Sequence, residues 1–62
     1  MGTKVAMRIV FFDKKAETYK AIENVTHMHI DYIKNRKCYV FYTEEGIKYL
    51  PYSGYDLHKI DC

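Results

Sequence analysis

Apolar and polar side chains alternate through the middle of the chain, between residues 27 and 52. β-branched and aromatic residues fill three short runs there: 27–33, 38–43 and 47–50. A period of two is typical of strands on a pleated, half-buried sheet. The connecting segments 34–37 and 44–46 contain Asn35 and Gly46, which tolerate the positive φ of a tight turn. The pattern predicts three antiparallel strands joined by two hairpin turns.

The register of these hairpins follows from their loops. Segment 44–46 fits a type I turn followed by a glycine in the left-handed region. That loop predicts four cross-strand pairs: Val40–Leu50, Cys38–Tyr52, Phe41–Tyr49 and Thr43–Ile47. The register of the first hairpin stays open, because Asn35-Arg36 differs from the favoured Asn-Gly and a slip by one residue exchanges every partner.

Residues 4–13 predict another strand, with apolar side chains on both faces, that ends at Asp13-Lys14-Lys15. Segment 16–23 fits two structures. It is either the return arm of a hairpin, which we favour, or two helical turns with Asp13 as N-cap. Residues 23–24 are expected to interrupt the strand structure, and the next strand is expected to begin at Val25.

The C-terminal part predicts one more strand. Pro51 has no N–H and should end the third strand of the hairpins or mark an exposed edge. Residues 52–55 predict a bend with Gly54 at positive φ, and residues 56–60 a last short strand.

These elements indicate an all-β domain, a five-stranded antiparallel curled sheet or a small SH3-like barrel. The alternative is an α+β fold with a short helix within 13–23. A chain of 62 residues forms a single domain, 1–62, with room for one core. The predicted core residues are Val5, Met7, Ile9, Phe11, Ile30, Val40, Leu50 and Leu57.

Composition narrows the class of protein. No apolar run approaches the roughly 18 residues of a membrane span, no signal-peptide pattern precedes the first strand, and the two cysteines predict reduced thiols. A cytoplasmic protein is therefore expected. The net charge of +2 is too small to imply a nucleic acid or a lipid surface by itself. Seven tyrosines and three phenylalanines suit either a small core or a contact surface.

His27, His29 and Asp31 are the candidate metal ligands, since alternate residues of a strand share one face. Cys38, His58 or Cys62 could supply a further ligand. The simpler interpretation, which we favour, is a strand with this polar face toward water, and Met28, Ile30 and Tyr32 toward the core. We therefore expect no metal and no cofactor. We also expect no catalytic residue, because the single serine, Ser53, and both cysteines lack an oriented base.

Two binding functions remain. The favoured one is a protein-interaction or accessory module that associates with a partner or with itself, as a homodimer, because apolar residues lie on both faces of the strands. The alternative is a single-stranded nucleic-acid binder, in which exposed rings stack bases beside basic residues. Its predicted surface comprises Tyr39, Phe41 and Tyr49 with Lys34, Arg36, Lys37 and Lys48. These rings could instead fill the core.

The strand pattern of residues 9–13, 19–31 and 46–60, with the bend Pro51-Tyr52-Ser53-x-Tyr55-Asp56-Leu57, resembles a type of small β-rich protein. Proteins of this type, which are uncharacterised, occur in Gram-positive bacteria and in their prophages or conjugative elements. The resemblance implies a bacterial accessory protein of the cytosol and assigns no role to any residue.

Overall fold

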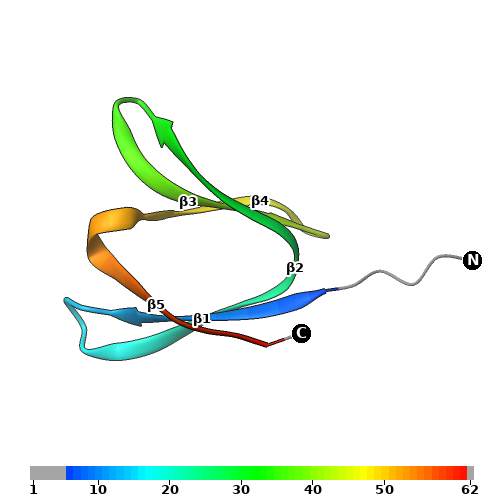
Figure 1. The fold of residues 1–62 in the computed structure, drawn as a ribbon, viewed down its shortest axis with the longest axis horizontal. Helices are drawn as coiled ribbons and strands as arrows, with labels where there is room; N and C mark the ends of the chain where they lie inside the picture. The colour runs from blue at the N-terminus through cyan, green and yellow to red at the C-terminus, as the bar shows by residue number, and fades with distance from the viewer. Residues whose placement is uncertain (1–5, 62) are drawn as a thin grey trace, which may run out of the picture.

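The computed structural model describes residues 6–61, which form five strands and one short 3-10 helix. The elements are β1 (Met7–Asp13), β2 (Thr18–Ile33), β3 (Arg36–Thr43), β4 (Gly46–Pro51), η1 (Tyr52–Gly54) and β5 (Tyr55–Asp61). The strands make one antiparallel sheet in the order β4-β3-β2-β1-β5. The sheet curls without closing, because no ladder joins the edge strands β4 and β5 over residues 6–61 (Figure 1). The predicted all-β curled sheet is confirmed.

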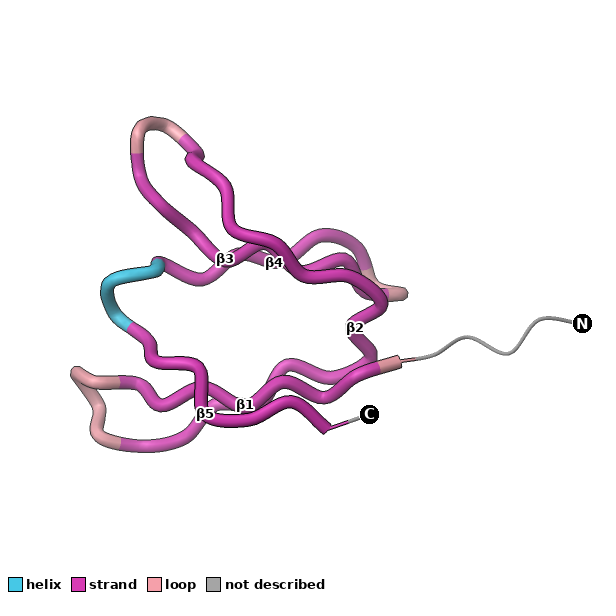
Figure 2. Tube along the Cα trace, in the orientation of Figure 1, coloured by secondary structure: helices cyan, strands magenta, loops and turns pink. Residues whose placement is uncertain are grey.

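The long strand β2 bends the sheet into two layers (Figure 2). Its register shifts against β1 between Met7 and Ile9, and against β3 between Val25 and His27. Asn24, which lies within the first shift, has a φ of 58°. Bulges of this kind bend a strand and let it pass from one layer to the next. One layer therefore contains β1, β5 and the first half of β2, and the other contains β3, β4 and its second half.

The hairpin arm predicted for 16–23 is confirmed, and the helical alternative is absent from the described residues. Residues 14–17 form the turn, and β2 begins at Thr18. Asp13 caps this turn, since its Oδ1 accepts hydrogen bonds from the amides of Lys15 (3.0 Å) and Ala16 (3.1 Å). The expected break at 23–24 was wrong, because a bulge at this point bends the strand without ending it.

The core lies between the two layers. It consists of Ile9, Phe11, Ile22, Val25, Tyr39, Phe41 and Leu50, with Met7, Met28 and Tyr55 packed against it. Of the predicted core, Ile9, Phe11, Val40 and Leu50 are buried and Met7 is partly buried, whereas Val5 lies outside the described residues.

Ile30 and Leu57 were wrongly predicted as core residues, and both are exposed. Ile30 lies on the β2–β3 hairpin, which extends beyond the two layers (Figure 1). Leu57 lies on β5, which is an edge strand and has a neighbouring strand on one side only.

The predicted register of the β3–β4 hairpin was wrong by one residue. Thr43 pairs with Gly46 directly, so Val40 faces Tyr49, Tyr39 faces Leu50 and Cys38 faces Pro51. The loop is therefore shorter than expected, although Gly46 has the predicted positive φ, at 118°. The side-chain hydroxyl of Thr43 holds this short turn, because it donates to the carbonyl of Gly46 (2.8 Å) and accepts from the amide of Glu45 (3.1 Å).

The β2–β3 hairpin has a two-residue loop, Lys34 and Asn35, between the paired Ile33 and Arg36. Both loop residues have positive φ, 51° and 66°, as a type I′ turn requires. Near this turn, β4 ends at Pro51 as predicted. The bend predicted for residues 52–55 is the 3-10 helix η1, and the predicted last strand follows it as β5. Gly54, predicted at positive φ, is not among the glycines with that conformation. No helix within residues 6–61 has the length and apolar character needed to cross a membrane.

Candidate interaction surface

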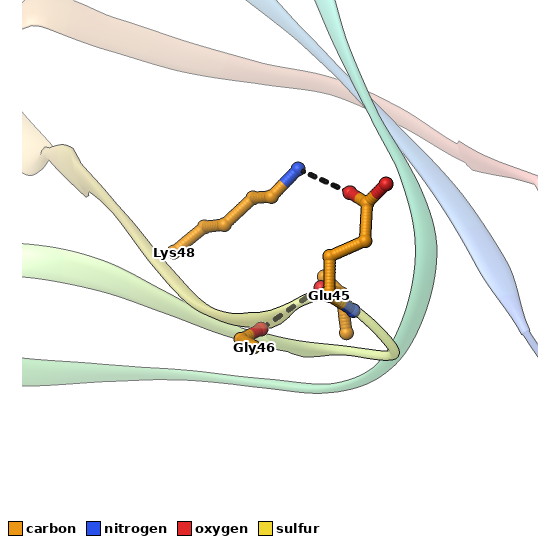
Figure 3. Close-up of polar contacts among 4 residues, drawn as sticks. Glu45, Gly46 and Lys48 are labelled. Atoms are coloured by element: carbon orange, nitrogen blue, oxygen red, sulfur yellow. Dashed lines mark hydrogen bonds and ion pairs between the residues drawn. The ribbon is translucent and has the colours of Figure 1, made fainter.

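The aromatic platform predicted from the sequence does not form. Tyr39 and Phe41 point into the core and are buried. Tyr49 pairs with Val40, so it lies on the opposite face of the sheet and is 53% exposed. Lys48 shares the inner side with Phe41, its cross-strand partner, and its Nζ lies 3.0 Å from Oε1 of Glu45 (Figure 3). Two of the three rings that this surface needed therefore lie together in the core, and the third lies on the other face of the sheet.

The remaining cations of that prediction do come together. Lys34, Arg36 and Lys37 lie at the end of the β2–β3 hairpin. Nζ of Lys37 lies 4.2 Å from the ring centroid of Tyr52, a residue of η1. The basic residues therefore adjoin Tyr52, which the sequence did not single out.

The candidate metal ligands His27, His29 and Asp31 share the outer face of β2, as expected from alternation. Nε2 of His29 lies 3.8 Å from Oδ2 of Asp31. Both imidazoles contact the ring of Tyr42, at centroid distances of 6.3 Å for His27 and 5.6 Å for His29. Residues 6–61 contain no group of three or more His, Cys, Asp or Glu side chains that could hold a metal ion.

The further candidate ligands lie in different places. Cys38 pairs with Asp31 across the β2–β3 ladder, and its thiol donates to the carbonyl of Arg36 at 3.5 Å. His58 contacts the ring of Tyr19 at 4.9 Å, on the other layer. Cys62 lies outside the described residues.

The outer surface of the layer formed by β2, β3 and β4 carries the more unusual pattern. Directly paired residues of an antiparallel ladder point to the same side, so the register defines this surface. We call it the β3 outer face. It comprises His27, His29, Asp31, Ile33, Arg36, Cys38, Val40, Tyr42, Ile47, Tyr49 and Pro51.

This face has few charges for a surface exposed to water. Asp31 and Arg36 are the only Asp, Glu, Lys or Arg residues among those that define this face, and both lie toward the hairpin turn at one end. Val40, at the centre, is only 4% exposed because the larger side chains around it cover it, whereas Tyr42, Ile47 and Tyr49 are exposed. The outer face of an antiparallel sheet is usually polar. The β3 outer face is therefore an apolar and aromatic patch without a cover.

The outer surface of the other layer provides the contrast. It carries ion pairs between Arg8 and Glu23 (2.8 Å) and between Lys59 and Asp61 (3.6 Å). Its aromatic side chains Phe12 and Tyr19 contact each other edge to face, with centroids 5.2 Å apart. Charge is thus concentrated on one outer surface and nearly absent from the other.

Tyr39 has the one clear electrostatic perturbation among the described groups. Burial raises the pKa of its phenol, and the neighbouring Tyr52 and Asp56 raise the same pKa further because a second negative charge near them is unfavourable. Its hydroxyl therefore stays neutral under ordinary conditions. This fits a structural role in the core for Tyr39.

The sequence contained the signal for the β3 outer face, but the predicted register concealed it. Tyr42 and Ile47, two of its exposed residues, were not named as surface candidates. With the observed register, Tyr42 pairs with Ile47 and Val40 with Tyr49, which places four bulky residues on one face. With the predicted register, Tyr49 was assigned to the same side as Phe41.

Comparisons of the chain with protein-family models, with curated proteins and with solved structures found no match. The resemblance to β-rich proteins of Gram-positive bacteria and their mobile elements stays a prediction.

Proposed function

We propose that this protein is a small non-enzymatic interaction module that self-associates through the β3 outer face. The observation that carries the proposal is an uncovered patch around Val40 with one residue of each charge. Contiguous apolar patches on small proteins generally mark contact sites. Tyrosine suits such contacts, because its apolar ring can be buried in the complex and its hydroxyl can hydrogen-bond to water in the free protein.

A second copy of the chain is the partner that fits the charge. Asp31 and Arg36 give the face no net charge, so two copies of it do not repel each other. A neutral face also lacks the excess charge that would draw a strongly charged macromolecule. Two-fold symmetric dimers are the commonest oligomers, and they pair identical patches.

The size of the face sets the expected strength. Three strands about 4.8 Å apart, with about six residues each at about 3.3 Å, cover roughly 14 by 20 Å. This is well below the roughly 800 Å² per partner of a standard interface. We therefore expect a weak, exchanging dimer with a dissociation constant of about 10–100 µM.

The alternative function, single-stranded nucleic-acid binding on Tyr39, Phe41 and Tyr49, has less support. Two of these rings are buried and the third faces the other way. Lys48, one of its cations, is already paired with Glu45.

Sedimentation equilibrium between about 10 µM and 1 mM tests the proposal, because that range spans the expected dissociation constant. The wild type should change from monomer to dimer, and Tyr49→Lys should remain monomeric because it places like charges in the contact. Tyr19→Lys is the matched control, since Tyr19 is similarly exposed (59%) but lies on the other layer. A wild type that stays monomeric overturns the proposal, as does a dimer that only Tyr19→Lys abolishes.

A further inference from the structure

A small cavity lies where β4 leaves the sheet. β4 ends at the Cys38–Pro51 pair, so Arg36 and Lys37 of β3 continue past it without a paired strand on that side. The chain turns there into η1, which connects the two layers (Figure 2). The resulting cavity of about 500 Å³, which we call the notch, is lined by Arg36, Lys37, Pro51, Tyr52 and Ser53.

The notch is basic and has no acidic wall. Its lining contains two cations and two hydroxyls, and no carboxylate. Within residues 6–61 neither Arg36 nor Lys37 has an ion-pair partner, whereas Arg8, Lys14, Lys48 and Lys59 each have one. Lys34, in the adjacent turn, is also without such a partner in this part of the chain. The positive charge of the hairpin is therefore available to an anion.

The wall of the notch is organised in advance. The Tyr52 ring stacks on Tyr39, with centroids 5.1 Å apart and planes inclined by 29°. Its other neighbour is the ammonium of Lys37, 4.2 Å from the ring centroid. A cation over an aromatic ring gains about 0.5–1 kcal/mol at an exposed site. Lys37 is thus held at the notch by its contact with Tyr52, whose ring stacks on the core residue Tyr39.

A free aromatic ring lies beside these cations. Tyr32 pairs with Lys37 across the β2–β3 ladder, so both side chains project from the same face of the hairpin. Tyr32 is 67% exposed, and within residues 6–61 its ring has no aromatic or cation contact. An exposed ring next to unpaired cations is the arrangement that binds single-stranded nucleic acid, because the ring stacks a base and the cations contact the phosphates.

We propose that the notch is a single-stranded nucleic-acid site, in which Arg36 and Lys37 contact a backbone phosphate and Tyr32 stacks on an adjacent base. A single strand fits better than a duplex, because stacking on Tyr32 requires an unstacked base. A nucleic acid fits better than an acidic peptide, because a peptide carboxylate leaves the Tyr32 ring unused. The site uses the hairpin end and the inner side of β2, so it does not require the dimer.

Fluorescence anisotropy with a labelled oligo(dT) of about twelve nucleotides tests this site at low salt, where phosphate contacts are strongest. We expect saturable binding that Lys37→Glu weakens by about tenfold or more, with Lys37→Gln as a milder variant. Lys20→Glu is the matched control, because it makes the same charge change at a lysine that has no ion-pair partner within residues 6–61 and does not line the notch. It should weaken binding by less than about threefold. Loss of one phosphate contact should also lower the salt slope by about one.

The base-stacking part has its own variants. Tyr32→Ala should weaken binding several-fold, whereas Tyr32→Phe should retain it, since a π-face is all that stacking needs. Arg36 also belongs to the β3 outer face, whereas Lys37 and Tyr32 project from the other face. Variants of Lys37 and Tyr32 therefore separate this site from self-association. Tyr49→Lys should bind the oligonucleotide like the wild type even if it no longer dimerises.

Several results overturn the proposal. One is no binding at low salt, and another is an equal loss for Lys20→Glu and Lys37→Glu, which indicates general charge attraction. Equal affinity for a duplex of the same length, or equally strong competition by poly-glutamate, also contradicts it, the latter in favour of a site for acidic chains.

Discussion

Phe11 and Phe41 meet edge to face in the interior, with ring centroids 5.5 Å apart and planes inclined by 79°. They come from β1 and β3, which are not neighbours in the sheet. Both side chains are fully buried. This contact therefore joins the two layers across the core, and an edge-to-face geometry adds about 0.5–1.5 kcal/mol to the burial itself.

We expect Phe41→Ala to lose about 3–5 kcal/mol of unfolding free energy, since it removes this contact and leaves a cavity. A core of this size supplies about 3–5 kcal/mol in total, so the variant should be largely unfolded at room temperature. Phe41→Leu should lose less and remain folded. Urea denaturation followed by circular dichroism measures both. Tyr32→Ala, at an exposed position, serves as the control, and a loss there as large as that of Phe41→Ala contradicts this account.

Gly46 and Gly54 differ in backbone conformation, because only Gly46 has a positive φ. This difference gives a second prediction. No atom lies within 4 Å of a Cβ added at either glycine, so sterics with neighbours are equal. Gly46 has a φ of 118°, which an alanine adopts only with strain of about 1–3 kcal/mol. Gly54 has no such φ, so alanine there restricts mainly the unfolded chain and should stabilise by about 0.4–1 kcal/mol. Opposite shifts of the urea midpoint confirm this, whereas equal shifts refute it.

The same glycines show how far the sequence predicts the fold. The strand regions of the hairpins, the turn residues Asn35 and Gly46, and the end of β4 at Pro51 followed from local residue chemistry alone. The register of the β3–β4 hairpin did not follow from it, because the loop after Thr43 allows Thr43 to pair with either Gly46 or Ile47. The choice depends on which side chains the opposite layer buries, and that information is not local.

Strand β2 shows the second limit. Its inward-pointing residues Ile22, Val25 and Met28 are three apart, because an extra residue is inserted at each bulge. Such spacing departs from the strand period of two and approaches that of a helix, so alternation alone does not identify these three residues as one face. The predicted aromatic platform failed for two reasons: Tyr39 and Phe41 lie in the core, and the shift of the register by one residue moves Tyr49 to the other face. The notch joins residues of β3 and η1, so it required the tertiary structure.

The buried phenol of Tyr39 predicts a loss of stability at alkaline pH. In the unfolded chain tyrosine ionises near pH 10, and in the folded protein the pKa of Tyr39 is higher because of burial and the nearby Tyr52 and Asp56. The contribution is therefore fully present below about pH 10 and is lost as the pH rises through the folded pKa. Urea denaturation between about pH 8 and 11 should show a steeper decline for the wild type than for Tyr39→Phe. Equal declines contradict the assignment, and Tyr32→Phe controls for an exposed tyrosine.

The edge strand β4 makes the last prediction. Pro51 has no N–H, so its pair with Cys38 carries no ladder bonds, and the alternate pairs of Leu50 with Tyr39 and of Lys48 with Phe41 carry them. The amides of Ile47 and Tyr49 therefore point away from β3. Within β4, Lys48 supplies a charge and the proline lacks a donor, and both features disfavour pairing of this edge with another chain. The double variant Lys48→Val/Pro51→Val adds a third free amide and removes the charge, so we expect large assemblies in place of the weak dimer. Light scattering measures this, with Lys20→Val as the control for a lysine off this edge. Lys20→Val should scatter light like the wild type. If the double variant also scatters like the wild type, these two residues do not protect β4 from pairing.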